Sequence, residues 1–184
     1  MLLISKKDLP TRLGFMQKLP VWYAVYTRSR TEKKTVDDLT ERGIEAYIPL
    51  RKVLRQWSDR KKLVVVPLIN SYVFVRIEPS QYFEVLSSPG VVRYVYYCGH
   101  PAAIPEPQID ILKAIAGSDV EVESIPSKMP PGTRVRINAG PLCGIEGELS
   151  RFAGRNKVVI RIGQLDHTIM LTISPMLIEH CSMN

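Results

Sequence analysis

The feature that most constrains this chain is a polar, acidic segment with three prolines, which begins at Gly117 and ends at Pro131. It has no sustained hydrophobic periodicity, and proline disrupts both helices and central strands. Helical and strand patterns both occur before the segment, whereas only short alternating patterns follow it. The sequence therefore predicts a flexible linker over residues 118–131. This linker flexibly joins a domain at residues 21–117 to a second domain at residues 132–184, and residues 1–20 form an N-terminal extension.

Positive charge is concentrated before the linker. Residues 1–117 contain 18 Lys and Arg against 11 Asp and Glu, whereas residues 118–184 contain seven of each kind. A basic excess confined to one domain indicates that a polyanion binds to that domain. The alternative is that the excess serves only solubility.

Composition excludes several classes of protein. Hydrophobic residues form 45% of the chain, which is too many for a wholly disordered protein. No apolar run approaches the roughly 20 residues that a membrane helix needs, and the first residues lack the apolar length of a secretion signal. Three widely spaced cysteines do not suggest a disulfide framework. We therefore expect a cytoplasmic monomer with no membrane partner.

The first domain alternates strand and helix patterns. Its expected strands cover residues 22–27, 44–48, 71–77 and 91–97, and its expected hairpin has arms at residues 53–57 and 63–66. One helix follows a capping box at residues 29–32 and ends at Gly43, a second begins at Pro79, and a third covers residues 107–116. These elements predict an α+β sandwich, in which helices pack against a mostly antiparallel sheet.

The strand at residues 71–77 has two unlike faces. One face is aliphatic and typical of a core, whereas Tyr72, Phe74 and Arg76 share the other. Trp22 and Tyr26 likewise lie on one side of their strand, and we expect Trp22 to belong to the core. An aromatic face of this kind could receive a protein helix, stack nucleic-acid bases, or lie beneath a helix of its own domain.

The second domain has strand patterns alone. Five short strands are expected, at residues 134–137, 145–152, 157–162, 168–173 and 177–179. Their spacing suits a small closed barrel. Between the first two, Gly140, Gly144 and Gly147 supply tight backbone turns. This glycine pattern resembles a KOW motif, the signature of SH3-like barrels in transcription and ribosome proteins.

Three segments of the first domain carry a resemblance to a known family. Residues 22–26, 67–75 and 89–92 resemble the N-terminal domain of the NusG family, and a linker and a KOW barrel follow in the same order. The hairpin at residues 55–62 looks like that of the specialised UpxY-type branch, whose members antiterminate capsular-polysaccharide operons. The implied fold is an α+β N-terminal NusG-like sandwich, an antiparallel sheet with helices, followed by a small all-β SH3-like KOW barrel.

The resemblance implies a non-catalytic elongation factor that binds RNA polymerase across its cleft, suppresses pausing and opposes termination. Its aromatic face would receive the clamp helices of the polymerase through Tyr26, Ile69, Tyr72 and Phe74. The opposite side of the cleft would be met by Ser87 and Ser88, the two hydroxyls that stand where some relatives have a His-Thr-Thr-Thr run.

Basic residues of the first domain are the candidates for binding the non-template DNA strand. Arg28 and Lys34 match basic positions of the family's DNA surface, and the other residues are inferred from charge and from one aromatic ring that could stack a base. The full set is Arg28, Arg30, Lys33, Lys34, Arg55, Trp57, Arg60, Lys61 and Lys62. Arg51 and Lys52 adjoin it at the start of the hairpin.

The second domain would bind ribosomal protein S10 or Rho weakly. In the general factor of the family, a Phe in the loop before the fourth barrel strand helps to make those contacts. The loop here, residues 163–167, has no aromatic residue, and Leu165 is its only large apolar side chain.

The sequence leaves one other function open and disfavours another. An RNA-binding protein that uses the aromatic sheet face and the KOW barrel is the main alternative, although the strand lacks the Lys/Arg-Gly-aromatic start of the RRM motif. An enzyme is disfavoured because the three histidines are scattered and Cys98 and His100 lack companion ligands at zinc spacing. No phosphate loop or activated nucleophile is evident, so no metal or cofactor is expected.

Overall fold

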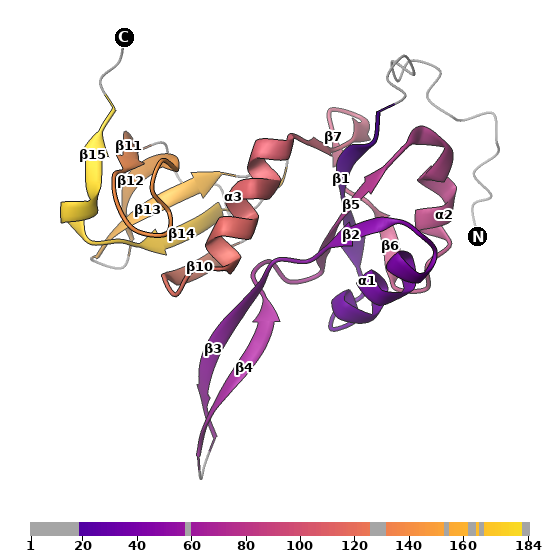
Figure 1. Ribbon diagram of the computed structural model, residues 1–184, viewed down its shortest axis with the longest axis horizontal. Coiled ribbons are helices and arrows are strands. Elements are labelled where there is room, and N and C mark those ends of the chain that lie inside the picture. The colour runs from indigo at the N-terminus through magenta and orange to yellow at the C-terminus, as the bar shows by residue number, and fades with distance from the viewer. Residues whose placement is uncertain are drawn as a thin grey trace.

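The computed structural model describes residues 19–57, 60–125, 132–152, 155–161, 165 and 168–181. An N-terminal antiparallel sheet and a C-terminal antiparallel sheet lie on either side of one helix, α3 (Figure 1). A long hairpin projects from the N-terminal part, away from both sheets (Figure 1).

The N-terminal sheet has five strands. They are β1 (Val21–Thr27), β2 (Glu45–Tyr47), β5 (Tyr72–Ile77), β6 (Val91–Tyr94) and β9 (Ala103–Ile104). The order is β2-β5-β1-β6, with β9 paired to β1, and all pairings are antiparallel. The α+β arrangement expected for this part of the chain is therefore confirmed.

Helices cover both faces of this sheet. Helix α1 (Glu32–Glu41) and the short α2 (Tyr82–Leu86), which follows the 3-10 turn η2 (Pro79–Gln81), pack on the face formed by the aliphatic side chains of β1 and β5. Helix α3 (Glu106–Ala116) packs on the opposite face. Helix α1 is followed by Gly43 at φ 78°, a left-handed conformation that favours glycine, as expected for a C-terminal stop.

Two hairpins stand apart from the sheet. The long one pairs β3 (Leu50–Gln56) with β4 (Lys61–Pro67) from Leu50 opposite Pro67 to Gln56 opposite Lys61. The short one pairs β7 (Tyr96–Tyr97) with β8 (His100–Pro101). It contains Cys98 at φ 49° and Gly99 at φ 82°.

The C-terminal sheet has six described strands where five were expected. They are β10 (Glu121–Ile125), β11 (Thr133–Ile137), β12 (Glu146–Phe152), β13 (Arg155–Arg161), β14 (Thr168–Thr172) and β15 (Ile178–His180). Their order is β10-β14-β13-β12-β11-β15. The 3-10 turn η3 (Pro175–Leu177) precedes the last strand.

The additional strand, β10, corrects the expected linker. It lies inside residues 118–131 and pairs with β14 from Glu121 opposite Thr172 to Ile125 opposite Thr168. Val122 in this strand is buried. The strand lies in a segment of acidic residues and prolines that favours a linker, and its pairing partner lies more than 40 positions away, so local sequence did not indicate it. Residues 126–131, the rest of the expected linker, lie outside the described residues.

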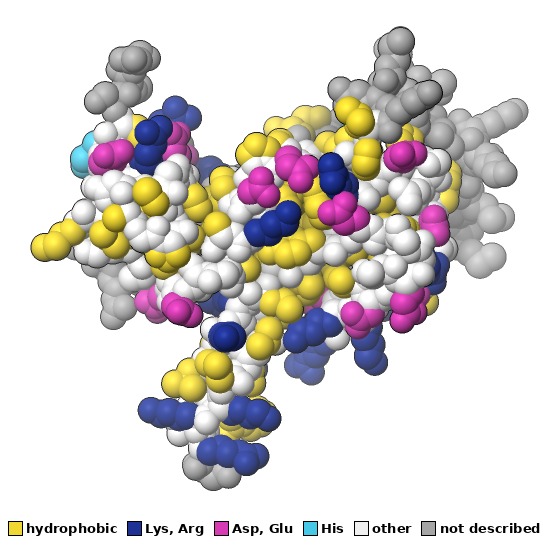
Figure 2. Space-filling model, viewed as in Figure 1, with side chains coloured by type: hydrophobic (Ala, Val, Ile, Leu, Met, Phe, Trp, Pro, Cys, Tyr) yellow, Lys and Arg dark blue, Asp and Glu magenta, His cyan; other side chains and the backbone are white. Residues whose placement is uncertain are grey.

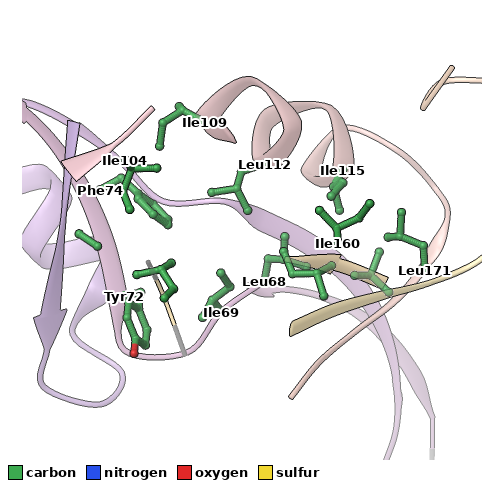
Figure 3. Packing of buried hydrophobic residues seen from close by; sticks show 14 of the residues in the cluster. Leu68, Ile69, Tyr72, Phe74, Ile104, Ile109, Leu112, Ile115, Ile160 and Leu171 are labelled. Atoms are coloured by element: carbon green, nitrogen blue, oxygen red, sulfur yellow. The ribbon is translucent and has the colours of Figure 1, made fainter. Parts of the chain in front are cut away.

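One hydrophobic cluster connects the two sheets. It extends from Phe74 of the N-terminal sheet through Leu112 and Ile115 of α3 to Ile160 and Leu171 of the C-terminal sheet (Figure 3). A hydrogen bond adds to this connection, because an Nη1 of Arg51 in β3 donates to the carbonyl oxygen of Val122 in β10. Helix α3 therefore presents apolar side chains to both sheets.

Candidate functional site

The exposed end of the aromatic face is formed by Tyr26 and Tyr72. These residues lie opposite each other in the pairing of β1 with β5, and their ring centroids are 5.1 Å apart in an edge-to-face arrangement. Arg93 of β6 lies opposite Tyr26 on its other side, with its guanidinium carbon 5.5 Å from the centre of the Tyr26 ring. Tyr26 is 36% exposed and Tyr72 is 7% exposed. This end of the sheet therefore presents a tyrosine and a cation to a partner.

The rest of the aromatic face is covered. Phe74 and Ile69 are fully buried in the cluster that includes Ile109 and Leu112 of α3 (Figure 3). Neither residue offers surface to a partner in this arrangement, which differs from the expected contact set. Trp22 is buried in the same cluster, as expected for a core residue.

A buried carboxylate fixes the turn that precedes Tyr72. Ser71 adopts a left-handed backbone conformation, with φ 63°, and its N–H donates to Oε1 of Glu32 at 2.9 Å. The Ser71 carbonyl accepts the N–H of Thr27, also at 2.9 Å. The turn is thus held by α1 on one side and by β1 on the other.

The expected capping box at residues 29–32 is therefore not made. Helix α1 begins at Glu32 with Thr31 as its N-cap, and no side chain caps it. The Thr31 hydroxyl donates to the carbonyl oxygen of Arg28 instead. The sequence did not predict that Glu32 binds the backbone of Ser71, because Ser71 lies 39 positions away and no local pattern links the two residues.

A basic cavity of about 320 Å³ lies between the start of α1 and the turn before β6. Arg28 and Lys34 contribute its cations, and the Arg28 N–H donates to the Gly90 carbonyl at 3.0 Å. The full lining is Arg28, Thr31, Lys34, Thr35, Asp38, Ser88, Pro89 and Gly90. The two cations that the family resemblance selected are therefore brought together in one concave site.

Gly90 permits this approach of the turn to the helix. A Cβ at this position would lie 1.9 Å from Oγ1 of Thr35, so any larger side chain would force the turn away from α1.

The two serines of this turn, both expected to contact the polymerase, have different surroundings. Ser88 is buried and lines the cavity, whereas Ser87 donates to the Glu84 carbonyl and accepts a hydrogen bond from Arg42.

The remaining cations lie around the hairpin and the start of α1 (Figure 2). Arg30 is exposed at φ 64°, and Lys33 donates from Nζ to the Val65 carbonyl at 3.2 Å, which connects α1 to the hairpin. Further out on the hairpin, the exposed members of the expected set are Arg55, Trp57, Arg60, Lys61 and Lys62. The Trp57 N–H donates to the Arg60 carbonyl at 2.8 Å, which closes the described end of the hairpin. The hairpin residues are thus brought together with one another, but away from the cavity.

The glycines of the C-terminal motif occupy conformations that other residues would disturb. Gly140 has φ 84° and Gly144 has φ 87°, and the Gly144 N–H donates to the Ile137 carbonyl at 2.7 Å. A Cβ on Gly147 would lie 2.8 Å from side chains of Val158 and Ile160. Leu165 is buried in the main cluster and offers no contact surface, while its loop neighbours 163, 164, 166 and 167 lie outside the described residues.

Possible metal ligands in the described part of the chain gather only in groups of fewer than three. No group of three His, Cys, Asp or Glu side chains there converges to hold a metal ion. The described cysteines, Cys98, Cys143 and Cys181, are free thiols. None of the described helices combines the length and the apolar character needed to cross a membrane.

This chain matches one family model and several solved structures. A family model described as transcription termination factor nusG matches residues 20–113. A solved structure that concerns domain interaction in Thermotoga maritima NusG is 24% identical in sequence to this chain and matches it with a TM-score of 0.55. That match covers 92% of this chain and 100% of the other. No curated protein matches.

Two further solved structures come from the MjSpt4:Spt5 complex, in conformations A and B. They are 17% and 16% identical, cover 89% and 88% of this chain and 99% and 97% of theirs, and have TM-scores of 0.30, too low to bear on the fold. The family model, in contrast, spans slightly more than half of the 184 residues and contains the aromatic face, the basic cavity and the hairpin. The chain belongs to the NusG family.

Proposed function

We propose that the protein is an elongation factor that binds RNA polymerase across its cleft, suppresses pausing and opposes termination at specific operons. NusG-family proteins are non-catalytic factors with a general role in transcription elongation, and they interact with RNA polymerase. The finer assignment to the UpxY-type branch, with polysaccharide biosynthesis operons as targets, rests on the sequence of the hairpin. The site of action is the cytoplasm, where the polymerase is.

The observation that carries the proposal is the Tyr26–Tyr72 pair at the open end of the aromatic face. A rigid ring pair beside Arg93 suits the tip of a protein helix, because a few aromatic and arginine residues supply most of the binding energy of many interfaces. The clamp helices of the polymerase are the proposed occupant. Ile69 and Phe74 support these rings from beneath, and they become contacts only if α3 moves.

DNA binding is the second part of the proposal. The cavity with Arg28 and Lys34 and the exposed cations of the hairpin would hold phosphates of the displaced non-template strand. Bridging the polymerase and this strand stabilises the closed cleft, because a ligand that prefers one state shifts the population towards it.

The C-terminal sheet is proposed to be a KOW domain. Its glycine turns support this assignment. With Leu165 buried, we propose that its binding to ribosomal protein S10 or Rho is weak.

The test of polymerase binding is the Tyr26→Ala variant. We expect it to weaken binding of core RNA polymerase by about 1–3 kcal/mol, the range of interface anchors. Titration of labelled protein with polymerase measures this loss. Tyr97→Ala is the matched control, because Tyr97 is also an exposed tyrosine but lies on β7.

Two results would contradict this proposal. One is a polymerase affinity that Tyr26→Ala leaves unchanged. If the same variant instead lost affinity for single-stranded RNA, the protein would be an RNA-binding protein that uses its aromatic face.

A further inference from the structure

The long hairpin carries large apolar side chains that no described residue covers. Leu54 is 60% exposed, Leu63 is 57% exposed and Val65 is 45% exposed. Leu54 and Leu63 form a direct cross-strand pair, and Val65 lies opposite Lys52 on the same face of the ribbon. We call these three residues the leucine patch.

Both faces of the hairpin carry cations and apolar side chains. Pairs alternate between faces, so the leucine patch shares its face with Lys52 and with the pair Gln56–Lys61. The other face carries Arg55 opposite Lys62. Figure 2 shows apolar and basic side chains interspersed along the projecting hairpin. Val53 and Val64 also lie on that other face, so each face combines apolar and basic groups. On its own face the leucine patch is flanked by Lys52 and Lys61.

We propose that the leucine patch docks in an apolar groove with an acidic rim on RNA polymerase, as a second anchor besides Tyr26. This inference rests on the proposed function. Charge complementarity argues for the acidic rim: the hairpin holds six cations, Arg51, Lys52, Arg55, Arg60, Lys61 and Lys62, against Asp59 as its only acidic residue.

The same charge argues against a second copy of this chain on the patch. Two hairpins packed face to face would bring like charges together, which is unfavourable. Among the described residues, the C-terminal sheet leaves the patch exposed, and a hydrogen bond that joins this sheet to the hairpin is made by Arg51, near the start of β3.

The length of the hairpin allows both anchors to act together. Seven residues per strand at about 3.3 Å each extend the ribbon by roughly 20 Å. Lys33 links the hairpin to α1 through the Val65 carbonyl, and this link limits how freely the ribbon swings. A large partner seated on Tyr26 is therefore within reach of the patch.

The test uses a double variant that carries both Leu54→Ser and Leu63→Ser, and it compares this variant with the unaltered full chain. We expect about tenfold weaker binding of core RNA polymerase, unchanged affinity for a single-stranded DNA oligonucleotide, and an unchanged melting temperature. Phe83→Ser is the matched control, because Phe83 is 55% exposed on α2, and it should leave polymerase binding unchanged.

Four outcomes would overturn the inference. Unchanged polymerase affinity removes the second anchor; if Tyr26→Ala still weakens binding, the proposed function survives alone. A parallel loss of DNA affinity assigns the patch to nucleic acid. A dimer of the unaltered chain that the double variant dissociates assigns it to a second copy. If the unaltered chain does not bind polymerase at all, the proposed function fails, and this inference fails with it.

Discussion

At the scale of single residues, the clearest functional constraint is the hydrogen bond between Glu32 and the backbone of Ser71. The Glu32 side chain is buried, and its Oε1 accepts the N–H of a residue held at positive φ. Without this acceptor a partly buried N–H would lose its partner, which is unfavourable. The position of Tyr72 in the candidate polymerase site therefore depends on a helix residue that does not touch the partner.

Replacing Glu32 by Ala should lower the free energy of unfolding by about 1–3 kcal/mol, the cost of an unpaired buried donor. Glu32→Gln keeps an acceptor oxygen and should recover most of this loss. Urea unfolding of the full chain measures both variants, with the exposed Glu41→Ala on α1 as a control. Equal losses for the Ala and Gln variants would show that the charge, not the acceptor, is what matters.

At the scale of elements, the hairpin is expected to contribute charge to DNA binding. Each phosphate that a cation neutralises steepens the salt dependence of affinity, with a slope of about −0.7 per contact for single strands. Replacing Arg60, Lys61 and Lys62 by Ala should therefore flatten the slope for a single-stranded oligonucleotide by about 2 if all three act. An unchanged slope would assign these residues to a solvated surface. The exposed Lys113→Ala on α3 controls for net charge.

The C-terminal sheet contains an ion pair that makes its stability depend on pH. Arg161 donates from Nε and Nη2 to the two carboxylate oxygens of Glu148, at 3.1 and 3.0 Å, and Gly132 donates its N–H to the same carboxylate. These hydrogen bonds, that of Arg161 above all, lower the pKa of Glu148 although partial burial opposes the shift. A carboxyl whose pKa is lower in the folded state stabilises the fold above its unfolded pKa, and this contribution is lost as pH falls.

We therefore expect amide protection in β12 and β13 to fall as the pH drops below about 4.3, the ordinary pKa of a glutamate. Glu148→Gln should weaken this dependence, because its side chain does not titrate. Hydrogen exchange between pH 3 and pH 7 measures the effect, with Glu121→Gln on β10 as a control. The same acid sensitivity in the Gln variant would show that other carboxyls are responsible.

At the scale of the whole molecule, β10 and α3 join the two sheets into one arrangement. Val122 is buried in the cluster that also contains Leu112 and Phe74. An Asp at position 122 would place a carboxylate among apolar side chains, which is costly for a charge without a partner. We expect Val122→Asp to release β10 and to expose the amides of β14 to exchange, while the exposed Glu121→Ala leaves them protected. Unaltered protection of β14 in the Asp variant would mean that β10 contributes little to the sheet.

Local sequence by itself determined most of the elements. Alternation predicted β1, β5 and the long hairpin, because successive side chains of a strand point to opposite faces. Gly43 correctly predicted the end of α1, because glycine adopts positive φ without steric cost. Alternation also placed Trp22 with Tyr26 and Tyr72 with Phe74 within their strands, and the register adds that Tyr26 and Tyr72 lie opposite each other.

Only the tertiary structure decided which of these residues are available to a partner. Tyr26, Tyr72 and Phe74 share one face of the sheet, yet Phe74 is fully buried beside α3, Tyr72 is only 7% exposed, and Tyr26 is 36% exposed. Likewise, the sequence pattern did not predict that Glu32 accepts the N–H of Ser71 or that β10 pairs with β14. The physical reason is the same in each case: periodicity reports which face a side chain occupies, whereas burial depends on what a distant part of the chain places over that face.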